Sequence, residues 1–173
     1  MQAEAPGKIE IRDEHADDAT AIRDLHRQAF GQDQEGNLVE ALRSNGAVSL
    51  SLVATLGGHV VGHILYSPLS VSEVQGVALG PMAVLPEHHH RGIGSELVEA
   101  GNRRLKEARC PFIIVVGHAD FYRRFGFEPA STRGITCEWE LPDEVFMVLA
   151  LDSAQMQGVS GLAKYRREFS DVS

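Results

Sequence analysis

The sequence predicts an α/β fold in which a mixed, strongly twisted central sheet carries helices on both faces. Segments that alternate like strands and segments with helical spacing follow one another along the chain. Residues 49–84 hold three apolar, β-branched runs, which are typical of a strand meander. Residues 112–116 (FIIVV) are apolar throughout, as is typical of a central strand covered on both faces.

The first part of the chain predicts one strand and two helices. Residues 8–12 alternate like a strand, and residues 15–30 then have roughly helical spacing. The apolar residues of that helix are Ile22, Leu25 and Phe30. A shorter helix is predicted over residues 36–46, ending at Asn45-Gly46.

The middle of the chain predicts a hairpin, a further strand and a long helix. Gly57 and Gly58 have the usual chemistry of a tight hairpin turn, and residues 76–84 complete the meander. A helix follows Gly92 and ends at Pro111, with one apolar stripe facing the sheet. The stripe consists of Ile93, Leu97, Gly101, Leu105 and Ala108.

The last part predicts a short helix over residues 121–125 and a hairpin formed by residues 126–130 and 144–152. Gly126 is expected to end the short helix in a left-handed conformation. Phe125 and Phe127 are assigned to the core, and Tyr165 and Phe169 to a C-terminal arm that packs onto the domain.

The length of 173 residues fits a single domain spanning residues 1–173, with a core over about 8–151 and an arm over 152–173. A domain of this size buries roughly 70% of the surface that its unfolded chain exposes. No run approaches the ~18 apolar residues of a membrane span, and the first ten residues lack the pattern of a signal peptide. We therefore expect a soluble, cytoplasmic protein that makes no membrane contact.

Charge and cysteine content exclude several classes of protein. The net charge of −8 argues against a general nucleic-acid binder, because affinity for a polyanion comes mainly from Lys and Arg. Cys110 and Cys137 are too few for a disulfide framework and lack the spacing of a metal finger, so reduced thiols are expected.

Residues 85–95 (LPEHHHRGIGS) place glycines and an arginine at the start of the long helix. A helix start attracts anions, and Gly92 and Gly94 have no Cβ atoms to keep a phosphate from the backbone. Arg91 and Ser95 add a charge and a hydroxyl group. A Walker loop is absent, and a dinucleotide fingerprint requires glycine where Leu97 stands, so an NTP or dinucleotide binder is the weakest interpretation.

Two segments resemble motifs of the GNAT superfamily of N-acetyltransferases. Residues 80–98 (GPMAVLPEHHHRGIGSELV) look like its acetyl-CoA-binding motif, and residues 121–130 (FYRRFGFEPA) look like its later Tyr-x-x-x-Gly-Phe element. The resemblance covers most of residues 8–151 and looks closest to the bacterial YhbS-like branch. Two departures stand out: His89 occupies the usual Gln/Arg position, and the Asn-x-x-Ala element before the tyrosine is missing.

The resemblance implies acetyl-CoA as cosubstrate and acetylation of a primary amine by direct attack on the thioester. It implies that the backbone of the strand binds the pantetheine arm, and that the turn holds the pyrophosphate. The strand residues are Met82, Ala83 and Val84; the turn residues are His89, His90, Arg91, Gly92, Ile93, Gly94 and Ser95.

Tyr122 matches the tyrosine that protonates the departing CoA thiolate in the family. A tyrosine with an ordinary pKa near 10 is protonated at pH 7 and can donate a proton. The amine also needs a base, which the sequence leaves open among four ionisable residues and a chain of water molecules. These residues are Glu35, Glu73, His118 and Asp120.

The three consecutive histidines His88, His89 and His90 are not expected to bind a metal, because adjacent side chains rarely converge on one ion. A pH-dependent contribution to phosphate binding is favoured instead. The acceptor pocket is expected from residues 29–42 and 130–142. Within these segments, side chains that could bind a cationic amine are Trp139, Glu35, Glu138 and Glu140.

The main alternative is a catalytically silent module that binds or senses acyl-CoA on the same fold, because a fold does not determine a function. The acceptor can be a small molecule or a protein amino group, and a homodimer is compatible with the sequence.

Overall fold

The computed structural model describes residues 7–171 and is organised around a nine-stranded mixed sheet. The strands are β1 (Ile9–Asp13), β2 (Leu50–Leu56), β3 (His59–Val71), β4 (Val74–Val84), β5 (Phe112–Val116), β6 (Glu128–Pro129), β7 (Ile135–Thr136), β8 (Phe146–Ala150) and β9 (Gly161–Lys164). The α-helices are α1 (Ala19–Phe30), α2 (Gln34–Ser44), α3 (Ile93–Glu107), α4 (Ala119–Tyr122), α5 (Ser153–Met156) and α6 (Glu168–Asp171). Residues 1–6 and 172–173 lie outside the described residues. The predictions for the first residues of the chain and for the end of the arm fall there.

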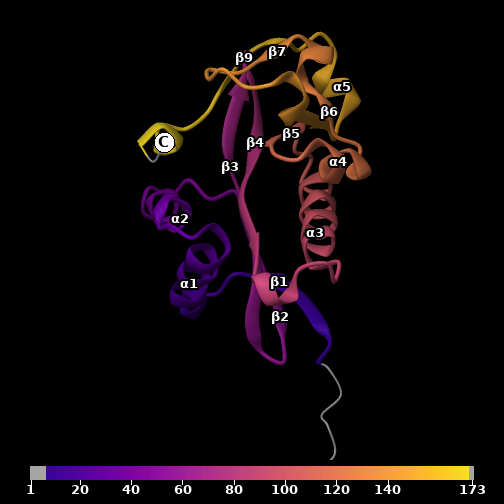
Figure 1. Ribbon diagram of the computed structural model, residues 1–173. Helices are drawn as coiled ribbons and strands as arrows, with labels where there is room; N and C mark the ends of the chain where they lie inside the picture. The colour runs from indigo at the N-terminus through magenta and orange to yellow at the C-terminus, as the bar shows by residue number, and fades with distance from the viewer. Residues whose placement is uncertain (1–6, 172–173) are drawn as a thin grey trace, which may run out of the picture.

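The strands pair in the order β1-β2-β3-β4-β5-β8-β6, and β9 pairs with both β3 and β7. Every pair along this path is antiparallel except β4 with β5, which α3 connects. Figure 1 shows α1 and α2 on one side of the long β3–β4 hairpin and α3 on the other. The predicted mixed sheet with helices on both faces is therefore confirmed. No helix within residues 7–171 is long and apolar enough to cross a membrane.

The hairpin between β2 and β3 turns at Gly57 and Gly58, as the sequence predicted. Both glycines have positive φ angles, 57° and 82°, which two-residue hairpin turns of the I′ type require. Gly46, after α2, also has a positive φ of 66°. The helix end predicted at Asn45-Gly46 is therefore confirmed, although α2 begins at Gln34, two residues before the prediction.

In α1 the predicted apolar face is wrong at one position. Ile22 and Leu25 are buried, but Phe30 is 43% exposed, because it is the last residue of the helix. The inward-facing position is occupied by His26, which is fully buried. The imidazole ring of His26 stacks on the ring of Phe30 at a centroid distance of 5.9 Å.

The apolar stripe of α3 packs on the sheet through its first four predicted members, which are Ile93, Leu97, Gly101 and Leu105. Ala108 is exposed, because the helix ends at Glu107. The prediction that Pro111 ends the helix is wrong as well. The backbone reverses at Arg109, which has a left-handed φ of 61° two residues before the proline.

Gly101 brings α3 close to the sheet, because a Cβ atom at this position would lie 2.1 Å from the hydroxyl oxygen of Tyr66. Tyr66 is fully buried and cannot move outward. We expect Gly101→Ala to lower the free energy of unfolding by about 2 kcal/mol, despite the better helix propensity of alanine. Urea unfolding measures this. The matched control is Gly36→Ala in α2, where the nearest atom is 3.6 Å away; equal losses in both variants would contradict the prediction.

The strand β5 is buried as predicted over its first four residues, but Val116 at its end is 43% exposed. The next helix begins at Ala119 rather than at residue 121 and continues as a 3₁₀ turn over Arg123–Phe125. Gly126 ends that turn with a φ of 93°, which confirms its left-handed conformation. Phe127 is 2% exposed, and Phe125 is half-buried beside the same cluster.

The C-terminal region differs most from the prediction. The expected hairpin between β6 and β8 is present and antiparallel. The arm, however, also adds a strand to the sheet, since β9 pairs with the far end of β3 and with the unpredicted short strand β7. Tyr165 and Phe169 pack against the domain, as expected of the arm. Beyond β9 the chain crosses toward α2, where α6 lies (Figure 1).

Candidate active site

The site begins where β4 and β5 separate. Their parallel pairing ends at Leu79 opposite Val115, after which β4 continues in contact with β3 alone. The β3–β4 register shifts between Ile64 and Tyr66, so a bulge lies beside Gly80 and Pro81. This irregularity parts the two central strands and leaves one edge of β4 without a partner strand within the described chain.

Residues 82–84 form that open edge. On their other side they pair in register with Ile64, His63 and Gly62 of β3. Because backbone groups of a strand point alternately to its two sides, this segment can offer amide and carbonyl groups to an extended ligand.

The turn between β4 and α3 contains two residues with left-handed backbone. Gly92 precedes α3 with a φ of 80°, and His90 has a φ of 63°. The ring of His89 forms a 2.8 Å hydrogen bond from Nε2 to the carbonyl oxygen of Val84, which fixes the turn on the end of β4. The first N–H groups of α3, which follow this turn, have no partner within the helix.

Two turn residues pack inward rather than facing the opening. Ile93 is 1% exposed, so only its backbone amide can contact a ligand. A Cβ atom on Gly94 would lie 3.6 Å from Phe121 and 3.9 Å from Met82, which shows how closely the turn, α4 and β4 meet.

Arg124 is a functional candidate that the sequence reasoning missed. Its Nη2 donates a hydrogen bond to Oγ of Ser95 in the first turn of α3, at 3.2 Å. Its guanidinium group lies over the rings of Phe121 and Phe125, 5.7 and 5.5 Å from their centroids. A signal was available in the sequence, because Arg124 follows Tyr122 by two residues within the recognised motif.

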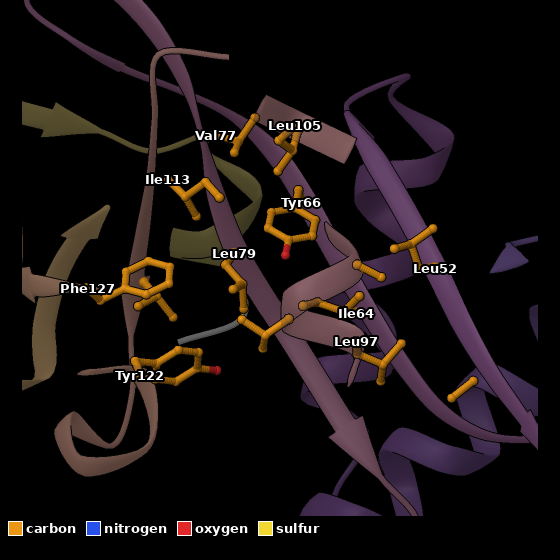
Figure 2. Close-up of a cluster of buried hydrophobic side chains, with 14 of the residues drawn as sticks. Leu52, Ile64, Tyr66, Val77, Leu79, Leu97, Leu105, Ile113, Tyr122 and Phe127 are labelled. Carbon is orange, nitrogen blue, oxygen red and sulfur yellow. The ribbon is translucent and has the colours of Figure 1, made fainter. Parts of the chain in front are cut away.

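Tyr122 lies at the end of α4 in an aromatic cluster. Its ring contacts Phe121 and Phe127 edge to face, with centroid distances of 4.9 and 5.6 Å. Figure 2 shows its hydroxyl pointing away from Phe127 and toward the strand that carries Leu79. Gly117 makes room for the ring, since a Cβ atom there would lie 2.5 Å from Cε2 of Tyr122.

The environment of Tyr122 keeps its hydroxyl protonated. The residue is 7% exposed, and burial raises the pKa of its hydroxyl to about 12. No residue within 7–171 forms a hydrogen bond with this hydroxyl. The group therefore stays protonated at neutral pH, and its proton is not engaged by a protein acceptor.

The four candidate bases are dispersed. Glu35 lies in the first turn of α2 and accepts a hydrogen bond from Gln32, while Glu73 is on the hairpin turn between β3 and β4. His118 and Asp120 are exposed at the start of α4, nearest to Tyr122 in the chain. The identity of the base stays a prediction.

An apolar cavity of about 310 Å³ opens at the separation of β4 and β5. Leu79, Gly80, Pro81 and Val116 line it from the strands. Trp139 also lines it, as the sequence reasoning expected of the late loop.

The acidic residues that the sequence offered as candidates for binding a cationic amine do not line the cavity. Glu138 instead accepts a hydrogen bond from the backbone N–H of Tyr165 at 3.0 Å, and Glu140 is exposed. Glu35 is held by Gln32 outside the cavity. Glu138 and Glu140 are therefore exposed loop residues, because the loop directs Trp139 inward and its two acidic neighbours away.

The comparisons with known proteins agree with this arrangement. The family described as "Acetyltransferase (GNAT) domain" matches residues 48–129. The chain is 35% identical over 163 residues to an uncharacterized N-acetyltransferase, YhbS, of Escherichia coli K12, covering 92% of this chain and 98% of that relative. It is also 35% identical over 134 residues to E. coli YjhQ, another uncharacterized N-acetyltransferase, covering 73% and 74% of the two chains.

Solved structures show the same likeness. The crystal structure of E. coli YhbS in complex with CoA has a TM-score of 0.92 and 33% identity, covering 98% of this chain and 96% of that one. A GNAT family acetyltransferase of Brucella melitensis in complex with acetyl-CoA has a TM-score of 0.79 and 31% identity, covering 94% and 99%. The chain therefore belongs to the GNAT family of N-acetyltransferases, and its fold is the GNAT fold.

Proposed function

We propose that this protein transfers the acetyl group of acetyl-CoA to a primary amine by direct attack on the thioester. The observation that supports it is the opening between β4 and β5, at which the free edge of β4, the start of α3 and Tyr122 meet. The crystallised relatives with CoA and acetyl-CoA support the choice of cosubstrate. We further propose that residues 1–173 act as a single domain.

In this proposal the open edge of β4 binds the pantetheine arm, and the turn with the start of α3 binds the pyrophosphate through backbone amides. The residues concerned are Met82, Ala83, Val84, His89, His90, Arg91, Gly92, Ile93, Gly94 and Ser95. His89 contributes by holding the turn, since its Nε2 is engaged by Val84. Arg91 and Arg124 add positive charge beside the helix start in a chain of net charge −8.

The chemistry needs positioning more than covalent help from the protein. The lone pair of the neutral amine attacks the thioester carbonyl carbon, so that a C–N bond forms and the C–S bond breaks. Tyr122 gives its proton to the departing sulfur, and the nitrogen loses one proton, which returns the tyrosine to its starting state through solvent. The products are an N-acetyl amide and CoA with a free thiol.

The test is calorimetry with acetyl-CoA together with release of free thiol across a panel of primary amines. Binding with amine-dependent thiol release is the expected result. Heat of binding without turnover of any amine would instead favour the acyl-CoA sensor, and absence of binding at millimolar acetyl-CoA would overturn both.

Arg124→Ala is expected to weaken acetyl-CoA binding about 5-fold, because the variant loses a charge-assisted contact worth ~1 kcal/mol near the pyrophosphate. Arg123→Ala is the matched control: Arg123 lies in the same turn and forms no ion pair or side-chain hydrogen bond with residues 7–171. Calorimetry with CoA compares the two. Equal dissociation constants in both variants would show that Arg124 does not contact the cosubstrate.

We also propose a cytoplasmic location. Cys110 and Cys137 are both free thiols, which suits a reducing compartment. The homodimer stays a prediction, and sedimentation equilibrium measures it directly.

A further inference from the structure

The cavity at the separated strands lacks charged side chains. Besides the strand residues, its walls are Leu38 of α2, Leu141 of the late loop and three aromatic residues. The aromatic residues are Trp139, Tyr165 and Phe169. A cavity of about 310 Å³ is large enough for a small organic molecule and too small for a folded peptide segment.

The three aromatic side chains form one continuous wall. The ring centroids of Trp139 and Tyr165 are 4.9 Å apart, and those of Tyr165 and Phe169 are 5.1 Å apart. Aromatic rings at these distances and tilted angles stabilise one another. Tyr165 and Phe169 come from the C-terminal arm, so this arm completes the pocket (Figure 1 shows its path above α2).

The arm is held in place by buried polar contacts. Glu168, 2% exposed, accepts hydrogen bonds from Asn45 at the end of α2 and from Arg166, at 2.9 and 2.8 Å. The pairing of β9 with β3 fixes the preceding segment. The aromatic wall is therefore formed before any ligand arrives, which lowers the entropic cost of binding an apolar group.

This lining favours one chemical class of acceptor. An apolar group gains about 25 cal/mol for each Å² that it buries, whereas a cation in the cavity loses hydration without finding a carboxylate. Attraction of an ammonium group to aromatic faces, about 0.5–2 kcal/mol, does not offset that loss. Glu35, Glu138 and Glu140, which could have paired with a cation, lie outside the lining.

We propose that the acceptor is a primary amine carrying an aryl or bulky alkyl group, which fills this cavity while the amino group meets the thioester between β4 and β5. The inference rests on the proposed acetyl transfer and narrows its substrate class. In the reaction the amine nitrogen forms the C–N bond as the C–S bond of acetyl-CoA breaks, and CoA leaves as the thiol. Amines with a second ammonium group, including polyamines, are excluded from the cavity.

Thiol release with three amines tests the proposal. The three amines share an unhindered amino group: they are 2-phenylethylamine, n-butylamine and 1,4-diaminobutane. The diamine differs from n-butylamine only in that its terminal carbon carries an ammonium group. We expect kcat/KM to fall about 10-fold at each step in that order, in line with loss of apolar burial and then addition of an unpaired charge. A diamine that reacts as well as the aryl amine would overturn the proposal.

A charge placed in the cavity gives a sharper test. Leu141, which lines the cavity, is 36% exposed, so Leu141→Asp is compatible with folding. We expect this variant to shift the preference at least 10-fold toward 1,4-diaminobutane, since the aspartate can pair with its distal ammonium. The matched control is Leu162→Asp on β9, an apolar residue 41% exposed and outside the cavity, which should keep the wild-type preference. Identical preferences in both variants would contradict the assignment.

Fluorescence separates this inference from the proposed reaction. Trp139 is the only tryptophan in the sequence, so its emission reports binding in the cavity whether or not turnover occurs. We expect 2-phenylethylamine to change this emission at concentrations where 1,4-diaminobutane does not. Such a response without thiol release would overturn the proposed reaction and support the ligand class; no response to the aryl amine at millimolar concentrations would overturn the ligand class.

Discussion

Replacing Tyr122 with phenylalanine is expected to lower kcat roughly 100-fold and to leave the affinity for acetyl-CoA unchanged. The substitution removes one oxygen atom from a ring that is already packed between Phe121 and Phe127, so the fold of the site is retained. In the proposed mechanism, it removes the proton that goes to the departing sulfur. Thiol release at saturating amine measures kcat, and calorimetry measures the affinity for acetyl-CoA.

The raised pKa of Tyr122 is compatible with this role. Burial raises the pKa of the hydroxyl to about 12, above the ~8.5 of an ordinary thiol. In the proposed complex the same burial would also disfavour the thiolate that develops beside Tyr122, which would offset the weaker acidity of the hydroxyl. Because the hydroxyl stays protonated well above neutral pH, wild-type kcat is not expected to decline through ionisation of Tyr122 at mildly alkaline pH.

Tyr66→Phe is the control for the loss of a buried tyrosine hydroxyl. Tyr66 lies in the same hydrophobic cluster, and its hydroxyl donates a hydrogen bond to Oδ1 of Asn102 at 3.4 Å. We expect this variant to keep its kcat and to lose only stability. If Tyr122→Phe turned over as fast as Tyr66→Phe, the role of Tyr122 as proton donor would be wrong.

The parts of the site that the sequence predicted are those that depend on local backbone chemistry. Gly92 and Gly126 have positive φ angles, which glycine adopts without steric cost. A glycine at such a position can therefore be recognised from the sequence alone. Tyr122 was found by its fixed spacing to Gly126. In contrast, the hydrogen bond from Arg124 to Ser95 joins segments far apart in the chain, and although Arg124 lies within the recognised motif, no local pattern indicates this contact.

The sequence indicated the two segments that contribute Leu38, Trp139 and Leu141 to the acceptor cavity, but not the part that the C-terminal arm forms. Its aromatic wall joins Trp139 with two residues of the C-terminal arm, and the arm reaches them only because β9 adds to the far end of β3. β9 is four residues long and β7 two, too short for an alternating pattern to be recognised. The acidic composition of the late loop therefore suggested a cation site, although the side chains that face inward are apolar.

The helix α1 shows how a polar residue can replace an expected apolar one. Periodicity assigned an inward position to Phe30, but the fully buried residue is His26. Its Nε2 lies 2.8 Å from Nδ1 of His63, and Nε2 of His63 lies 2.8 Å from Oγ of Ser51. With His26 donating to His63 and His63 donating to Ser51, no buried donor of the two rings is left unpaired; only the acceptor Nδ1 of His26 has no partner.

This buried chain of two neutral imidazoles predicts that the protein loses stability in mild acid. Burial lowers the pKa of His26 to about 4, and burial together with the charges of His26 and Arg43 lowers the pKa of His63. Unfolded histidines bind protons below about pH 6.5, whereas the folded pair stays neutral, so the folded state is favoured fully above that pH and progressively less below it. The paired carboxylates Asp18 and Glu168 have pKa values lowered to about 2, so their stabilising contribution is lost as the pH falls from the ordinary carboxylate pKa of about 4 toward 2.

We therefore expect the free energy of unfolding to fall between pH 6.5 and pH 4.5 by about 1.4 kcal/mol per pH unit for each histidine that stays neutral. Urea titrations at several pH values measure the slope. His26→Phe keeps an aromatic ring in α1 and should lower the slope by the contribution of one histidine. His59→Gln, at the exposed β2–β3 turn, should leave the slope unchanged. A free energy of unfolding that stays constant over this interval in the wild-type protein would contradict the prediction. It would show that the buried histidines bind protons in the folded state as readily as in the unfolded state.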